Sequence, residues 1–251
     1  MSRLYSLVLT TVVLLWSIFC CSFALVVALI SKKAIPWVLK GIGSNLWSKY
    51  IMVFTGNSRM SITHHSKVSI PSELPSRAIF VSNHVSQLDI NAASYAIPHP
   101  IVFLAKDSIR KVPILGLLNE RVGTVFINRS NKEAAQKAVF QLRKTLDLGI
   151  SVLVFPEGTR SIDGAIKPFK KGAFHLALQA NVPIVPMHIH GTRRALPSKS
   201  IWVKANPIHV RFGDPIYPKD HGDNVKSMND VAKASIEALQ SWHREQISSP
   251  D

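Results

Sequence analysis

The chain has 251 residues, with 30 Lys and Arg against 15 Asp and Glu, and a formal net charge of +15 at pH 7. This length allows one folded domain with or without a membrane anchor. The charge indicates an anionic partner such as a lipid surface, a phosphorylated substrate or an acidic protein. The only cysteines, Cys20 and Cys21, are adjacent and exclude a disulfide framework. Zinc-finger spacing, long basic runs and aromatic RNA-binding signatures are absent from the sequence, so nucleic acid is not expected as a partner.

The first predicted element is an apolar segment. Residues 4–30 contain no charged side chain, and the run exceeds the roughly 20 residues that cross a bilayer. Arg3 precedes it and Lys32, Lys33 and Lys40 follow it, which places the following domain on the cytoplasmic side of the membrane. A cleaved signal peptide is the main alternative, but the run is long and no small-residue cleavage site stands at its end. The two cysteines within it are expected to face the membrane.

Residues 35–54 mix aromatic, basic and apolar side chains. This composition is typical of a helix in the membrane interface, and an ordinary core helix is the alternative. We therefore expect membrane-anchoring helices over residues 1–54 and an α/β domain over residues 55–251. The protein should lie at a membrane, the bacterial inner membrane if its source is bacterial. Whether residues 4–30 span the bilayer or fold back into one leaflet stays open.

The remainder of the chain alternates short apolar runs with amphipathic segments. Residues 55–75 predict a short strand and a connection. A mixed, largely parallel sheet flanked by helices follows from the alternation of strands and helices. Strands are predicted at residues 78–82, 101–105, 123–127, 152–155, 184–189 and, as one or two strands, within 201–212. Helices are predicted at residues 90–96, 174–180 and 227–246, and from a capping box at Ser130 and Glu133 to a stop at Gly149.

Residues 81–89 read V-S-N-H-V-S-Q-L-D directly after an apolar run. His84 would stand at the exit of a buried strand, with Asp89 five positions on in the first turn of a helix. Five steps of about 100° on a continuous helix would point the two side chains apart, so their contact requires a break at His84. An imidazole can take a proton near neutral pH, and a carboxylate can orient it. A surface histidine beside an aspartate cap is the alternative.

Charged residues also follow other predicted strands. Lys106, Arg129 and the pair Glu157 and Arg160 each come just after one. Carboxyl ends of parallel strands meet at one edge of a sheet, where open α/β sheets bind ligands. We therefore expect these side chains to converge with His84, although each alone is more often a surface ion-pair partner or a helix cap.

Four sequence blocks, in this order and spacing, resemble the PlsC-type lysophosphatidic acid acyltransferase family. The resemblance covers roughly residues 78–191 and implies the glycerolipid acyltransferase fold, with an N-terminal membrane-embedded helical segment. The blocks are N-H-V-S-Q-L-D at 83–89, G-T-V-F-I-N-R at 123–129, F-P-E-G-T-R-S at 155–161 and V-P-I-V-P-M-H-I-H-G at 182–191.

The resemblance implies roles for individual residues. His84 would be the general base and Asp89 the residue that orients it, with direct attack of an acceptor hydroxyl on a thioester. Arg129 would bind the acceptor's phosphate, for which the planar guanidinium is suited. Lys106 is added from its position after a strand. The full set assigned to substrate binding is Asn83, Lys106, Arg129, Glu157, Gly158, Thr159 and Arg160.

The implied reaction transfers an acyl chain from acyl-ACP or acyl-CoA to the sn-2 hydroxyl of lysophosphatidic acid, giving phosphatidic acid for phospholipid biosynthesis. Membrane lipids would be further partners, and no cofactor is expected. Thr159 in E-G-T-R resembles this branch, since enzymes that acylate glycerol 3-phosphate usually carry E-G-G-R. The alternatives are an acyltransferase for another lysolipid, such as a lyso-ornithine lipid, a non-catalytic lipid-binding protein, or a thioesterase.

His188 and His190 are two apart on a predicted strand and so share a face, which could hold a metal ion. No third ligand is visible in the sequence. A packing or hydrogen-bonding role is therefore favoured, and no metal requirement is predicted.

Overall fold

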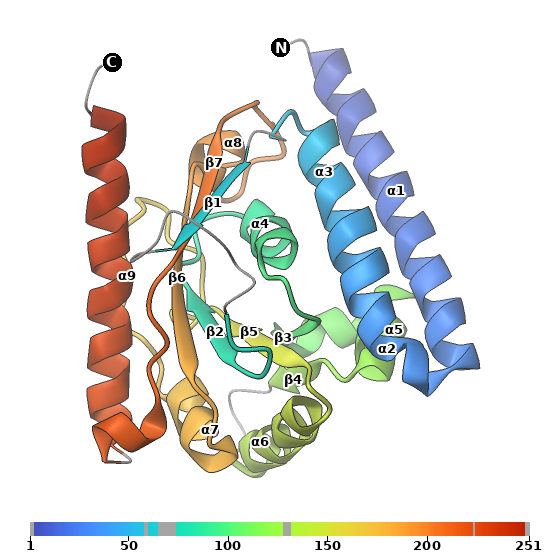
Figure 1. Ribbon diagram of the computed structural model, residues 1–251. Coiled ribbons are helices and arrows are strands. Elements are labelled where there is room, and N and C mark those ends of the chain that lie inside the picture. The colour runs from blue at the N-terminus through green and yellow to red at the C-terminus, as the bar shows by residue number, and fades with distance from the viewer. Residues whose placement is uncertain (1–2, 58–59, 65–73, 128–131, 223, 249–251) are drawn as a thin grey trace.

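Seven strands form one sheet in the order β1-β7-β6-β2-β5-β3-β4, with helices on both of its faces (Figure 1). The computed structural model describes residues 3–57, 60–64, 74–127, 132–222 and 224–248. The predicted mixed, largely parallel α/β architecture is confirmed. The strands are β1 (Met60–His64), β2 (Ile79–Ser82), β3 (Ile101–Lys106), β4 (Val125–Ile127), β5 (Ser151–Val154), β6 (Ile184–His190) and β7 (Ile208–Phe212).

Five neighbouring strands run in the same direction. β6, β2, β5, β3 and β4 pair in parallel, whereas β7 pairs antiparallel with β6 and carries β1 in parallel on its outer side. Every residue of β2 and β5 is buried, as expected for central strands covered on both faces. The carboxyl ends of the five strands therefore lie along one edge of the sheet.

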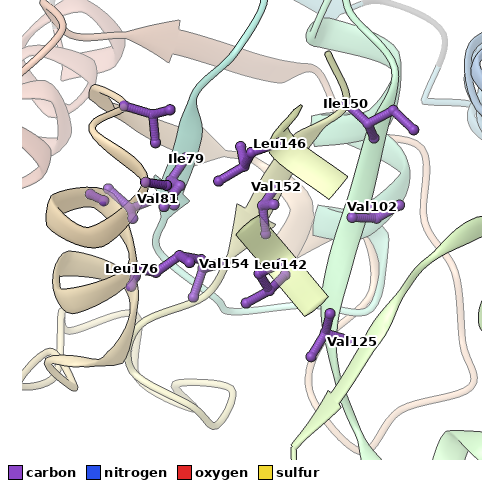
Figure 2. Packing of buried hydrophobic residues seen from close by; sticks show 14 of the residues in the cluster. Ile79, Val81, Val102, Val125, Leu142, Leu146, Ile150, Val152, Val154 and Leu176 are labelled. Atoms are coloured by element: carbon purple, nitrogen blue, oxygen red, sulfur yellow. The ribbon is translucent and has the colours of Figure 1, made fainter. Parts of the chain in front are cut away.

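The core lies between the sheet and the helices α6 (Lys132–Asp147), α7 (Gly172–Ala180) and α9 (Val225–Ser248) on one face, and α4 (Leu88–Ala96) on the other. Alternate strand residues point to opposite faces. Figure 2 shows the face of the sheet that α6 and α7 cover, where side chains of these helices contact those of the strands. The labelled residues are Ile79, Val81, Val102, Val125, Leu142, Leu146, Ile150, Val152, Val154 and Leu176.

The N-terminal helices fold back on each other beside α4. α1 (Arg3–Ile30) is followed by a helix that passes through α2 (Ile35–Trp37) and a π-helical stretch (Val38–Ser48) into α3 (Lys49–Phe54), and this second helix lies between α1 and the sheet (Figure 1). Trp47 Nε1 donates to Ser17 Oγ (3.0 Å) across the pair. Within the described part of the chain, only Leu7–Ile30 is long and apolar enough to cross a membrane, and a signal sequence would meet the same test.

The expectation that both cysteines face the membrane is wrong for Cys20. Cys20, Ala24 and Ala28 are four residues apart and form one stripe of α1. All three are buried against the rest of the protein. Composition identifies an apolar helix, but small residues on one stripe mark the side where another element packs closely.

One predicted strand region is largely loop. Of residues 201–212, only β7 forms a strand, while Ile201 and Trp202 are exposed. Pro207 stands immediately before β7 and has no backbone N–H to donate, which suits a strand start and not a strand interior. The remaining elements are three 3₁₀ turns, Lys32–Ala34, Asp107–Lys111 and Pro218–His221, and the helices α5 (Leu115–Val122) and α8 (Thr192–Ala195). Ser130, the predicted cap of α6, lies outside the described residues.

Four histidines of β6, β7 and α9 form a cluster. His188 and His190 on β6 share a face as predicted, and His209 on β7 and His243 on α9 join them, with ring centroids 5.1–6.3 Å apart among neighbours. His188 Nδ1 and His243 Nδ1 are hydrogen-bonded at 2.8 Å. Among the residues that the structure describes, no group of three or more His, Cys, Asp or Glu side chains is placed to hold a metal ion.

This cluster predicts a loss of stability in acid. Burial, with the positive fields of His190, His209 and Arg211, lowers the pKa of His243 from 6.5 to about 3. The folded protein therefore favours neutral His243. The resulting contribution to the free energy of unfolding is complete above pH 6.5 and declines as the pH falls from there toward 3. By proton linkage His243 alone should cost about 2 kcal/mol at about pH 5 relative to about pH 7.5. Urea midpoints at the two pH values measure this loss.

The matched variants are His243→Phe, which should lose clearly less stability in acid, and His221→Phe, which should follow the unmodified protein. His221 is half-buried beside Ser227, to which its Nδ1 is hydrogen-bonded at 3.0 Å. If the urea midpoints of the unmodified protein and of His243→Phe fall by the same amount in acid, the histidine cluster does not set the acid sensitivity.

Candidate active site

His84 lies in the turn between β2 and α4, and its Nδ1 is 2.9 Å from Asp89 Oδ2. The same oxygen accepts the backbone N–H groups of Val85 (2.7 Å) and Ser86 (2.8 Å). α4 begins at Leu88. His84 therefore precedes the helix and Asp89 lies in its first turn, which is the break predicted from the sequence. Asp89 is fully buried, whereas the His84 side chain remains 15% exposed. A carboxylate only accepts hydrogen bonds, so Nδ1 carries the proton and Nε2 of the neutral ring can take another.

The loop after β5 holds His84 by its backbone and by its ring. His84 N–H donates to Glu157 Oε1 (3.0 Å), and Ser161 N–H donates to the His84 carbonyl (2.7 Å). The ring stacks on Phe155 with centroids 4.1 Å apart and planes 18° apart. The imidazole is thus held by Asp89 and Phe155, and the backbone of His84 is held by Glu157 and Ser161.

Glu157 connects His84 to the far end of this loop. Its Oε2 accepts the backbone N–H of Lys167 (3.2 Å), and the side chain is buried. Burial raises the pKa of Glu157, while the two backbone hydrogen bonds and the positive charges of His84 and Lys167 act to lower it. Its contacts run through the protein backbone, so Glu157 shapes the site by holding His84 and the loop together.

Glu157→Gln should lower kcat by about tenfold, because the amide offers one acceptor oxygen where two N–H groups need one each. The turnover rate and the melting temperature measure this effect together. Glu237→Gln, which removes the charge of an exposed carboxylate paired with Lys233 on α9, is the matched control. A turnover rate unchanged by Glu157→Gln would contradict the holding role.

Asn83 ties the ends of two strands together. Its Nδ2 donates to the Ile189 carbonyl (3.0 Å), and its Oδ1 accepts the Ile189 N–H (2.8 Å). The side chain is buried. These bonds fix the end of β2 against β6, so Asn83 supports the His84 turn through the backbone, and its substrate-binding role stays a prediction.

The other predicted substrate-binding residues lie around the same edge. Gly158 adopts φ +74°, a left-handed conformation that favours glycine. Thr159 and Arg160 are exposed on the loop that holds His84. Lys106 ends β3, which is two strands from β2 in the sheet, and its side chain is not described. Arg129 lies outside the described residues.

An apolar cavity of about 400 Å³ opens beside His84. This volume is within the range of small-molecule sites. Its walls come from α1, the π-helical stretch, α4, β3 and α5, so the N-terminal helices complete the cavity. The lining includes Cys20, Cys21, Ala24, Trp47, Phe103 and Phe155.

Several contacts of the site were not predicted. Phe155 and Ser161 stand at the two ends of the third block, but their contacts with His84 depend on the shape of the loop. Thr192 directly follows the fourth block, and its Oγ1 donates to Asp89 Oδ1 (2.6 Å). The position of this threonine directly after the block was the only sequence signal for this bond.

Comparisons with known proteins identify relatives of this chain. Residues 61–190 match a family model described as "Acyltransferase". The 1-acyl-sn-glycerol-3-phosphate acyltransferase of Limnanthes douglasii is 38% identical over 170 residues, 65% of this chain and 60% of its own length. The protein of the same name from Haemophilus influenzae is 36% identical over 151 residues, 58% of this chain and 62% of its own. The matched region thus spans about 60% of the length of these curated relatives.

A solved structure is similar over nearly the whole chain. It is the crystal structure of PlsC from Thermotoga maritima, described as a 1-acyl-sn-glycerophosphate (LPA) acyltransferase. The TM-score is 0.73 at 25% sequence identity, and the match covers 96% of this chain and 98% of that one.

Proposed function

Because the chain belongs to the acyltransferase family, we propose that it transfers an acyl chain from acyl-ACP or acyl-CoA to the sn-2 hydroxyl of lysophosphatidic acid. The product is phosphatidic acid, and the place in metabolism is phospholipid biosynthesis. The observation that carries the proposal is the His84–Asp89 pair at the wall of an apolar cavity. The names of the related plant and bacterial proteins support the choice of acceptor.

In the proposed reaction Nε2 of His84 takes the proton of the acceptor hydroxyl as its oxygen attacks the thioester carbonyl. The new C–O bond forms and the C–S bond breaks, so the acyl chain passes directly to the acceptor. The imidazolium returns its proton to the departing carrier thiolate. Asp89 stabilises the imidazolium through Nδ1. No cofactor takes part in this scheme.

We assign the acyl chain to the cavity and the acceptor's phosphate to the basic residues Lys106, Arg129 and Arg160. The walls are mainly apolar and sequester a chain from water. Arg160 lies on the loop that holds His84, and Arg129 and Lys106 follow neighbouring strands in the sequence. Arginine binds phosphate oxygens in pairs with its planar fork. The donor's own anionic groups fit the strongly basic chain.

The N-terminal helices are proposed as a membrane anchor over residues 1–54 that lies along one leaflet. α1 runs alongside the α/β domain and not away from it (Figure 1). A helix crossing the bilayer in this position would draw the adjoining charged domain into hydrocarbon, which is costly. The outer face of α1 is exposed and apolar, with Leu15, Ile18 and Phe19 each more than half exposed. The lysines that follow the apolar run place the α/β domain, residues 55–251, on the cytoplasmic side.

The test is acyl transfer by the purified protein in vesicles, from acyl-CoA and from acyl-ACP, to lysophosphatidic acid, glycerol 3-phosphate and a lyso-ornithine lipid. Phosphatidic acid formed from lysophosphatidic acid supports the proposal. Selective turnover of another acceptor moves the substrate to a different lysolipid. Release of acyl chains to water at one rate with and without acceptor identifies a thioesterase, and turnover of nothing favours a lipid-binding protein.

The two native cysteines test the acyl assignment. Both line the cavity, and they are the only thiols of the chain. Prior incubation with acyl-CoA should slow alkylation of Cys21, which is less buried than Cys20, because the chain would occupy the space beside it. Coenzyme A without an acyl chain is the control, and equal alkylation under both conditions contradicts the assignment.

A further inference from the structure

Thr192 makes a hydrogen bond that the proposed mechanism does not yet use. It is the first residue of α8 and is fully buried. Asp89 Oδ2 serves His84 and two backbone N–H groups, and Asp89 Oδ1 accepts the Thr192 hydroxyl at 2.6 Å. That length is typical of a hydroxyl bonded to a carboxylate. Because Asp89 is fully buried, this hydroxyl takes the place that water would fill around an exposed carboxylate.

The backbone around Thr192 is held in position by several contacts. Gly191 adopts φ +91°, and a Cβ at this position would collide with the Pro207 carbonyl. The Gly191 carbonyl accepts a hydrogen bond from Asn206 Nδ2 (3.0 Å). The backbone N–H of Asn206 in turn donates to Oδ1 of Asn57 (2.8 Å), a residue that lies just after α3. Thr192 therefore approaches Asp89 from a corner that is tied to the end of the N-terminal helices.

A second bond joins this corner to the His84 turn. Ser86 Oγ donates to the Leu196 carbonyl, directly after α8, at 2.7 Å. The turn that carries His84 and Asp89 is thus bonded to both ends of α8. α8 therefore holds Asp89 in two ways. The Thr192 hydroxyl donates to Asp89 directly, and Ser86, which is bonded to Leu196, donates its backbone N–H to Asp89.

We propose that Thr192 is a positioning residue for the catalytic pair. Its hydroxyl holds Asp89 in the rotamer that keeps Oδ2 against Nδ1 of His84, so that Nε2 points at the acceptor. The role rests on the proposed function, in which His84 is the base. Among the described residues, the charged groups near His84 include Glu157, which accepts the His84 N–H, and Lys167, whose N–H donates to Glu157.

Thr192→Val keeps the shape of the side chain and removes only the donor. We expect kcat to fall by about 10- to 100-fold, with KM for both substrates within about twofold, because the acceptor and donor sites are untouched. The acid limb of the kcat/KM profile should move to lower pH, since a displaced Asp89 stabilises the imidazolium less. Thr192→Ser restores the hydroxyl and should return both kcat and the acid limb.

A proton resonance gives a readout that does not depend on turnover. In protein labelled with ¹⁵N-histidine, the Nδ1–H of His84 is assigned by its loss in His84→Gln. Thr192→Val should weaken this resonance and Thr192→Ser should restore it. Thr145→Val, the same change at a buried threonine of α6 that donates to the Gln141 carbonyl, should leave the resonance unchanged although it can lower the melting temperature.

Normal kcat and a normal Nδ1–H resonance in Thr192→Val would overturn the positioning role, as would failure of Thr192→Ser to restore them. If the unmodified protein acylates no acceptor, the proposed function fails on its own. The resonance then decides the Thr192 inference separately: loss in the valine variant with return in the serine variant supports it, and persistence in the valine variant overturns it.

Discussion

His84→Ala should lower kcat by about 10²- to 10⁴-fold, the usual contribution of a general base. His84 lines the cavity, and because its Nδ1 is bonded to Asp89, Nε2 is the ring nitrogen that can take the proton. The fold should survive, because the His84 backbone bonds to Glu157 and Ser161 do not involve the removed ring. Initial rates with saturating donor and acceptor, beside the melting temperature, measure the two effects.

The matched control is His175→Ala, since His175 is an exposed histidine on α7. It should turn over at the unmodified rate. Added imidazole should restore part of the activity of His84→Ala, because the substitution leaves a space of the ring's shape against Phe155. Near-normal turnover of His84→Ala without imidazole would remove His84 from the role of base.

The His84–Asp89 contact was accessible from the sequence because it depends on local geometry. Two residues five apart at a strand-to-helix junction can meet only across a break, and the alternation of apolar and amphipathic runs located that junction. The same reasoning found the central strands, since apolar runs of strand length that are followed by polar residues are typical of a parallel sheet. Local rules were sufficient wherever both partners belong to one turn.

The contacts that were missed join parts of the chain far apart in sequence. Glu157 and His84 are bonded across 73 positions, and Thr192 and Asp89 across 103. The family resemblance implies a role for Glu157 in the acceptor site, and this stays a prediction, while its oxygens accept the backbone N–H groups of His84 and Lys167. The side-chain positions of Lys106 and Arg129 are not described, so their phosphate-binding role remains a prediction.

The cavity was also beyond the reach of local reasoning. An apolar run over residues 4–30 predicts a membrane helix but not which stripe packs against a domain, and Cys20 was therefore placed on the wrong side. In the structure, Cys20 and Ala24 of that stripe line the cavity. The proposed anchor and the α/β domain thus share one binding space, and a change in the packing of α1 should alter acyl binding as well as membrane attachment.

Asp89→Asn isolates the charge of Asp89 from its hydrogen bonds. An asparagine oxygen placed where Oδ2 lies can still accept from His84 and from the Val85 and Ser86 N–H groups. The amide nitrogen then faces Thr192, whose hydroxyl can rotate to accept a hydrogen bond. The geometry of the turn should therefore persist, and the melting temperature should change by no more than about 4 °C.

Turnover should nevertheless fall by about 10²- to 10³-fold, because a neutral amide does not stabilise the imidazolium that forms as His84 takes the proton. The acid limb of the kcat/KM profile should move to lower pH for the same reason. Asp230→Asn, which removes an exposed carboxylate paired with Lys226 on α9, should change neither quantity. If Asp89→Asn is stable and its kcat is unchanged, Asp89 acts only by orienting the His84 ring. If kcat falls but the acid limb does not move, the charge of Asp89 does not act through the protonation of His84.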